Sequence, residues 1–211
     1  MTCSAAAIAL PAAPAAHAGS HLAGRRLRLH RDRDAERLDT EQFIARIYAE
    51  HFDARIGAVL AAAPTLVSIA DEDGRPVAAA GYRRAGGPLF LENYLPHPVE
   101  AAIAAAGSVP VQRATIAEVG HFASGRAGEG RRLMVLLGRH LVAEGFSWVV
   151  STATAELRSV FARLGIAPLT LGHADPMVLG DGAARWGSYY THAPLVLAGE
   201  IRANLARFDR G

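Results

Sequence analysis

Cysteine is almost absent from this sequence. Cys3 is the single one among 211 residues, which excludes an internal disulfide and any metal cluster built from cysteines. An excess of charge of one sign is also missing, because 22 basic and 20 acidic side chains leave a net charge of +2. The composition therefore gives no reason to expect nucleic acid or membrane partners. No segment reaches the roughly 18 unbroken apolar residues that a membrane-spanning helix needs.

Metal-site and hydrolase motifs are missing as well. The nine histidines are scattered and lack carboxylates at supporting spacings, so the sequence predicts no metal site. A Gly-x-Ser-x-Gly elbow, which marks many serine hydrolases, does not occur. What remains is a chain that is 51% hydrophobic, which is enough for one domain with a substantial core over residues 25–211.

The first 24 residues differ in composition from the rest. They are rich in Ala and Pro, and we expect residues 1–24 to form a disordered extension. Ala16-His17-Ala18 has the small-x-small pattern of a secretory cleavage site, but no Lys or Arg precedes Arg25, so the positive start of a signal peptide is missing. We therefore predict a cytoplasmic protein, with secretion as the alternative.

The spacing of apolar residues predicts a mixed α/β fold, a central twisted mixed sheet flanked by helices. Strands are expected at 26–30, 66–70, 77–82, 113–120 and 146–151, with weaker ones at 90–94, 169–171 and 194–197. Helices are expected at 41–54, 99–106, 131–144, from Thr152 to Leu164 and at 199–208. The turn Asp71-Glu72-Asp73-Gly74 makes a hairpin of the second and third strands.

A loop rich in glycine and arginine precedes the helix at 131–144. Free backbone N–H groups and the helix dipole favour an anion there, and glycine allows a phosphate to come close. Arg126, Arg131 and Arg132 can add charge-assisted hydrogen bonds. A plain surface turn is the alternative for this loop.

This loop and its neighbours resemble the acyl-CoA-binding core of the GNAT acyltransferase superfamily. Its pattern is R-x-x-G-x-G/A, often written R-R-G-I-G-R-A-L. Arg126-Ala127-Gly128-Glu129-Gly130-Arg131-Arg132-Leu133 fits the second half of it, with Gly125 in place of the first arginine of the longer form. Val160-Phe161-Ala162-Arg163-Leu164-Gly165-Ile166 resembles its L-Y-E-K-L-G-F. The resemblance implies a GNAT-type fold with acyl-CoA or an acyl-carrier protein as co-substrate and no permanently bound cofactor. It places the acyl-CoA on Val119, Gly120, Gly125, Arg126, Ala127, Gly128, Gly130, Arg131 and Phe161.

A second resemblance covers most of the chain outside this core. It is to the family described as thermostable hemolysin, and the pieces that carry it are 47–52, 78–83, 89–95, 118–124, 148–154 and 186–190. Their order also resembles the acyl-homoserine lactone synthases. Those enzymes have Glu-x-Ser-Arg-Phe-Ala-Val where this chain has Glu118-Val119-Gly120-His121-Phe122-Ala123-Ser124, so an S-adenosylmethionine substrate does not carry over.

Glu118 is the candidate general base. Acyl transfer to an amine requires removal of a proton, and a carboxylate beside the thioester can accept it. A structural Glu paired with an arginine is the alternative. Members of the superfamily often use a tyrosine as the general acid that protonates the leaving thiolate. This chain has Phe161 at that position, so protonation of the thiolate would rely on water, Tyr189 or Tyr190. The backbone N–H groups of Val119 and Gly120 would polarise the thioester carbonyl.

The acceptor is expected to meet residues of neighbouring segments. The candidates are Arg83, Glu92, Asn93, Arg113 and Trp186. A Glu92–arginine salt bridge and ordinary core packing of Trp186 are the alternatives. The sequence thus predicts an acyltransferase that acts by direct attack of a small amine on an acyl thioester. A secreted membrane-active cytolysin and a CoA-binding protein without catalysis stay open as alternatives.

Overall fold

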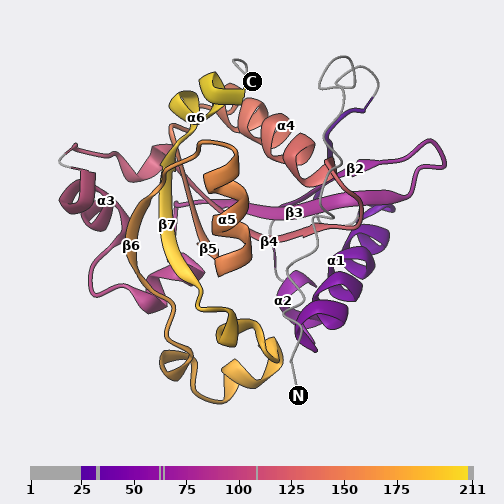
Figure 1. Cartoon of the computed structure of the whole chain (residues 1–211), viewed down its shortest axis with the longest axis horizontal. Helices are drawn as coiled ribbons and strands as arrows, with labels where there is room; N and C mark the ends of the chain where they lie inside the picture. Colours follow the sequence, from indigo (N-terminus) through magenta and orange to yellow (C-terminus); the bar gives the residue numbers. More distant parts are fainter. Residues whose placement is uncertain (1–24, 32–33, 62, 64, 108, 209–211) are drawn as a thin grey trace.

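The computed structural model describes residues 25–31, 34–61, 63, 65–107 and 109–208, so the expected extension at 1–24 lies outside the described residues. Within them, seven strands form one sheet in the order β1-β2-β3-β4-β5-β7-β6 (Figure 1). The strands are β1 Arg28–His30, β2 Thr65–Ala70, β3 Pro76–Arg84, β4 Ile116–Ser124, β5 Trp148–Ala153, β6 Leu169–His173 and β7 Leu195–Glu200. Only β4 and β5 pair in parallel.

Helices cover both faces of this sheet. They are α1 Arg37–Phe52, α2 Gly57–Ala61, α3 Val99–Gly107, α4 Glu129–Ala143, α5 Ala155–Arg163 and α6 Ile201–Phe208. Side chains of α1 and α2 share one buried cluster with Leu66, Ala79 and Ala123 of the sheet. Side chains of α4 share another with Ala78 and Ala117, on the opposite face. The predicted mixed α/β fold with a central sheet between helices is confirmed.

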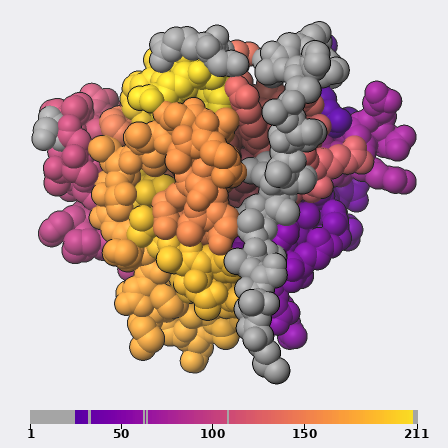
Figure 2. Space-filling model, in the orientation of Figure 1, coloured from indigo at the N-terminus to yellow at the C-terminus, as the bar shows by residue number. Residues whose placement is uncertain are grey.

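Four 3-10 helices complete the part of the chain that the structure describes, and they are where the sequence prediction differs most from the structure. They are η1 Phe90–Tyr94, η2 Arg113–Thr115, η3 Pro176–Trp186 and η4 Tyr189–His192. The strand predicted at 90–94 is wrong, because side-chain carboxylates accept the backbone N–H groups of this segment in place of a neighbouring strand. The segment from η3 to η4 forms a lobe at the bottom of the view (Figures 1 and 2).

The central strand β4 has two irregularities. It pairs with β5 only from Ile116 to Glu118, and beyond that point the described residues give β4 and β5 no further pairing. Against β3, Gly81 lies opposite Gly120 and Ala79 opposite Ala123, so His121 and Phe122 together face Ala80. This is a β-bulge, and such bulges bend a strand and redirect its side chains.

Candidate active site

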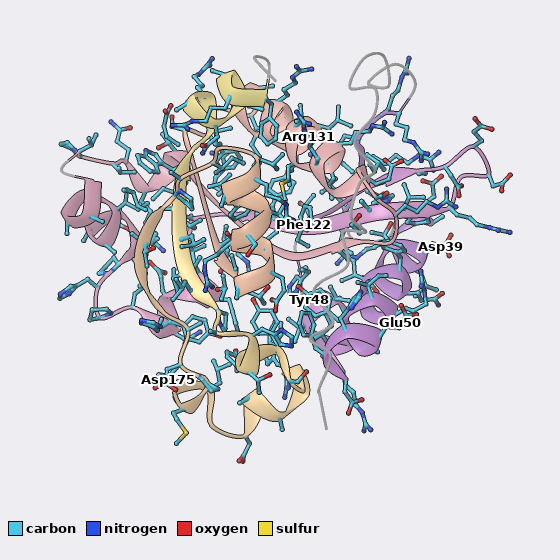
Figure 3. The ribbon with its side chains drawn as sticks, in the orientation of Figure 1. Asp39, Tyr48, Glu50, Phe122, Arg131 and Asp175 are labelled. Atoms are coloured by element: carbon cyan, nitrogen blue, oxygen red, sulfur yellow. The ribbon has the colours of Figure 1, made fainter. Side chains whose placement is uncertain are left out.

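A cleft of about 220 Å³ opens where β4 and β5 part. Its walls come from both faces of the sheet, with residues of α1 on one side and of α4 and α6 on the other. The walls are mainly aliphatic and aromatic, and few charged groups are among them. Figure 3 shows Tyr48, which lines the cleft, on the inner side of α1, and Asp39 and Glu50 on its outer side. An apolar cleft with a few polar groups is the usual form of a small-molecule site.

Glu118 is the buried carboxylate of this cleft, with 8% of its surface exposed. Its Oε1 accepts the Leu91 N–H at 2.8 Å and its Oε2 the Phe90 N–H at 3.1 Å. The Nε atom of Arg83 lies 3.1 Å from Oε2. The structural role considered for Glu118, an ion pair with an arginine, is therefore present. Glu118 is the third residue of β4, which extends past the predicted strand end at Gly120 and through the bulge to Ser124.

Burial raises the pKa of Glu118, and the two backbone N–H groups and Arg83 oppose that shift only in part. A carboxylate with a raised pKa binds a proton more firmly than one in water, so it is a better base near neutral pH. The contacts to η1 and the base role are physically compatible. The base role of Glu118 remains a prediction.

Eight of the predicted site residues line the cleft. They are Arg83, Glu118, Val119, Gly120, Phe161, Trp186 and the pair Tyr189 and Tyr190. The aromatic members are held by specific contacts: the Tyr189 hydroxyl donates to the Thr152 carbonyl at 3.1 Å, and the Tyr190 and Tyr94 hydroxyls lie 2.6 Å apart. Burial raises the pKa of both Tyr189 and Tyr190, which makes them weaker proton donors than a tyrosine in water. Trp186 is 6% exposed and also packs in the α1 core, so both of its expected roles are compatible with its position.

Three of the residues expected near the acceptor lie elsewhere. Glu92, Asn93 and Arg113 do not line the cleft. The Arg113 guanidinium contacts both Glu92 oxygens, at 2.6 and 2.9 Å, and Glu100 at 2.6 Å. These hydrogen bonds lower the pKa of Glu92 to about 2. The salt bridge considered for Glu92 is thus present, and it uses the charges that an acceptor was expected to meet.

The glycine and arginine loop also lies outside the cleft lining. Its three arginines have different neighbours: Arg126 pairs with Asp71 at 3.1 Å, Arg132 with Glu129 at 3.0 Å, and Arg131 lies 5.7 Å from the ring centre of Phe208. Gly128 starts α4 in the left-handed region, with φ of 80°. The buried Glu129 in the first turn already faces the positive end of the helix. A phosphate would have to compete with this carboxylate.

His121 is a cleft residue that the sequence analysis did not single out. Its ring stacks on Trp186, with centroids 6.1 Å apart and planes 12° from parallel. In a regular strand, residues 118 and 121 would face opposite sides of the sheet. The bulge places both on the side of α1 and η1, because Val119 and Phe122 pack on the α4 side. The spacing in the sequence could not have indicated this.

Comparison with known proteins gives one family and a set of similar folds. The sequence model of the thermostable hemolysin family matches residues 30–205. No curated protein matches the sequence. Within the described residues, no helix has the length and apolar character to cross a membrane.

The similar solved structures share little sequence with this chain. The acyl-homoserine lactone synthase LasI is 18% identical, with a TM-score of 0.57 over 87% of this chain and 91% of its own. FeeM, an N-acyl amino acid synthase from uncultured soil microbes, is 15% identical, with a TM-score of 0.59 over 88% and 97%. The CoA-dependent acyl-homoserine lactone synthase BjaI is 16% identical, with a TM-score of 0.56 over 89% of each chain. These likenesses show that the chain shares the overall fold of these synthases.

Proposed function

This chain belongs to the thermostable hemolysin family, and we propose that it is an acyltransferase that moves an acyl group from a CoA or carrier-protein thioester to a small amine. One observation carries the proposal: β4 and β5 separate beyond Glu118 and open an apolar cleft with this buried carboxylate on its wall. Proteins of similar fold are named as synthases that make acyl-homoserine lactones or N-acyl amino acids. These names support acyl transfer as the reaction class.

In the proposed reaction the amine attacks the thioester carbonyl carbon. A C–N bond forms, the C–S bond breaks, and the thiol leaves after taking up a proton. Glu118 accepts the proton that the amine loses. The N–H groups of Val119 and Gly120 lie at the point where β4 leaves β5, and they would polarise the carbonyl there.

The acceptor is proposed to carry a carboxylate next to its amine. Arg83 lines the cleft and uses Nε for Glu118, and the described residues give its Nη1 and Nη2 atoms no partner. Guanidinium groups bind carboxylates with two parallel hydrogen bonds, so the two Nη atoms suit that group. The name of FeeM, an N-acyl amino acid synthase, agrees with this choice.

Octanoyl-CoA is expected to bind the protein and raise its melting temperature, because a ligand selective for the folded state stabilises it. Arg126→Glu should weaken this binding by about 10- to 100-fold, the effect of losing one charge-assisted contact. Isothermal titration calorimetry measures both. Arg46→Glu is the matched control: Arg46 is similarly exposed, at 56% against 59%, and also pairs with an acidic residue.

Equal losses of affinity for octanoyl-CoA in the Arg126 and Arg46 variants would show that the glycine and arginine loop does not bind the acyl donor. If octanoyl-CoA does not bind the wild type, a free CoA thioester is not the donor. The same titration with an acyl-carrier protein then tests the second donor class.

The family name favours a second candidate function, a cytolysin that acts on membranes directly. If the protein is an acyltransferase, the purified protein should release no dye from phosphatidylcholine–phosphatidylglycerol vesicles at micromolar concentration. Fluorescence dequenching of an entrapped dye measures this, with the pore-forming peptide melittin as the positive control. Rapid dye release by the protein alone would favour the cytolysin.

A further inference from the structure

The bulge in β4 holds His121 in an unusual conformation. Its φ is 54°, in the left-handed region, which non-glycine residues occupy only with backbone strain. Such conformations collect at binding and catalytic sites, where the surrounding structure maintains them. Here the surroundings are Trp186, which stacks on the ring, and Tyr48, whose ring centre lies 6.4 Å from it.

The His121 ring is not satisfied by the protein around it. Its Nδ1 atom is buried without a hydrogen-bond partner, and the described residues give the ring no hydrogen bond at all. Leaving a buried polar atom unpaired destabilises the folded state, because the atom has lost its water and gained no partner. Strain and an unpaired nitrogen thus occur together at one residue of the cleft wall.

The burial pattern decides which nitrogen carries the proton. A proton on Nδ1 would bury an N–H group with no acceptor, whereas a proton on Nε2 places the donor on the ring nitrogen that is not among the buried, unpaired atoms. Burial and the nearby Arg83 lower the pKa of His121 to about 4, so the ring is neutral at pH 7. The neutral ring therefore offers an Nε2–H donor and no charge.

We propose that His121 is a catalytic residue whose Nε2–H donates a hydrogen bond to the thioester carbonyl oxygen of the bound acyl donor. The inference rests on the proposed acyltransferase function. As the amine attacks, the carbonyl electron pair moves onto this oxygen, and the donor stabilises the negative charge that develops there. When the C–S bond breaks, the pair returns to form the amide carbonyl. A neutral imidazole in a dry site is suited to this role because it donates without being deprotonated.

The position of His121 supports this role. It follows Val119 and Gly120, whose N–H groups lie where β4 leaves β5, and it shares the side of the sheet that Glu118 occupies. The base would then act on the attacking amine and the oxygen donor on the carbonyl, from nearby positions of one strand. The Cδ2 atom, next to Nε2 in the ring, faces Gly81, where a Cβ atom would lie only 3.3 Å away. The ring edge that bears the donor is thus fixed closely against β3.

The test measures the carbonyl itself and needs no knowledge of the acceptor. Octanoyl-CoA labelled with ¹³C at the carbonyl is bound to the protein, and its ¹³C NMR resonance is compared with that of free octanoyl-CoA. A hydrogen bond to the oxygen moves the resonance downfield. His121→Phe keeps an aromatic ring on Trp186 but has no donor, and His121→Gln places an amide N–H near the position of Nε2.

We expect a downfield shift in the wild type, loss of most of it in His121→Phe, and recovery in His121→Gln. Calorimetry should give all three proteins similar affinity for octanoyl-CoA. Thiol release from octanoyl-CoA, with the acceptor or with water, should fall about 100-fold in His121→Phe and less in His121→Gln.

An unchanged carbonyl resonance in a His121→Phe variant that binds octanoyl-CoA would overturn the role of His121 alone. Equal effects of the Phe and Gln variants would overturn it too, since the donor would then not be what matters. If the wild type binds neither octanoyl-CoA nor the octanoyl thioester of an acyl-carrier protein, the proposed function fails, and this inference fails with it. If His121→Phe does not fold, the resonance in wild type and His121→Gln decides: a shift in both supports the donor, and no shift in wild type overturns it.

Discussion

Glu118→Gln is expected to slow acyl transfer by roughly two to four orders of magnitude, the usual loss when a general base is removed. The amide has the shape of the carboxylate but cannot accept a proton from the amine. The affinity for the acyl thioester should stay close to that of wild type. A rise in pH should restore part of the rate, because more of the acceptor is then already an uncharged amine. Single-turnover thiol release at several pH values measures the effect.

The contacts of Glu118 mean that this variant also changes stability. The carboxylate accepts two backbone N–H groups, from Phe90 and Leu91, and an amide oxygen can replace only one carboxylate oxygen. The other N–H then faces an NH₂ group, which costs about 1–3 kcal/mol of unfolding free energy. A lower melting temperature alone therefore cannot decide between the two roles of Glu118.

Glu92→Gln is the matched control for this stability effect. Glu92 also accepts two backbone N–H groups, from Leu89 and Val99, and pairs with Arg113, but it lies outside the cleft. Both variants should lose stability, and only Glu118→Gln should lose the chemical step. A Glu118→Gln enzyme within about threefold of wild type would remove Glu118 from the mechanism, given that base loss costs at least about 100-fold.

The two glutamates also predict opposite pH dependences of stability. Burial raises the folded-state pKa of Glu118 above its ordinary 4.5, so its contribution is present below pH 4.5 and is lost as the pH rises through the folded pKa. The pKa of Glu92 is lowered to about 2, so its contribution is present above pH 4.5 and is lost as the pH falls toward 2. The stability difference between wild type and Glu118→Gln should shrink as the pH rises above 4.5. That between wild type and Glu92→Gln should grow between pH 2 and 4.5, as urea unfolding can show.

The parts of this fold that the sequence predicts are those that local patterns determine. The hairpin of β2 and β3 was expected because Asp71 and Gly74 favour a tight turn, and in the structure the Gly74 N–H donates to the Asp71 carbonyl. α4 was expected from its apolar stripe, and Leu133, Leu137 and Leu141 of that stripe are buried together. In both cases neighbours within a few residues supply the decisive contacts.

The cleft depends on contacts that no local pattern specifies. η1 reads as a strand by its apolar residues, yet its N–H groups bind Glu118, which is 27 residues away from Leu91. The bulge at His121 arises from the register between two whole strands, and a single strand does not indicate it. For the same reason Glu92 and Arg113 were expected near the acceptor: their residue types suggest binding, but only the packing shows that they bind each other.

The aromatic wall of the cleft depends in the same way on one glycine. Gly187 joins η3 to η4 with φ of 53° and lies against the end of α1. A Cβ atom there would be 2.0 Å from the Phe52 carbonyl oxygen and 2.7 Å from the backbone of Asp53. The next residue, Ser188, donates its N–H to the same Phe52 carbonyl at 2.7 Å. The backbones at Gly187 and Phe52 cannot move apart without breaking the hydrogen bond from the Ser188 N–H to the Phe52 carbonyl.

Gly187→Ala should therefore lower the unfolding free energy by about 3 kcal/mol or more, since backbone strain and a backbone clash act together. For a chain of this size that corresponds to a fall of roughly 10 °C in melting temperature. Gly182→Ala is the matched control, because a Cβ atom at this glycine of η3 would have its nearest neighbour at 4.0 Å. Differential scanning calorimetry of the two variants measures the difference.

The same substitution should affect the cleft before it unfolds the protein. Trp186 and Tyr189 flank the strained turn and line the cleft, so a shift of Gly187 moves both walls while the sheet stays intact. We expect Gly187→Ala to lose affinity for octanoyl-CoA well below its own melting temperature, and Gly182→Ala to keep it. If Gly187→Ala melts within about 1 kcal/mol of Gly182→Ala and binds octanoyl-CoA equally well, the close approach to Phe52 is not what holds the aromatic wall in place.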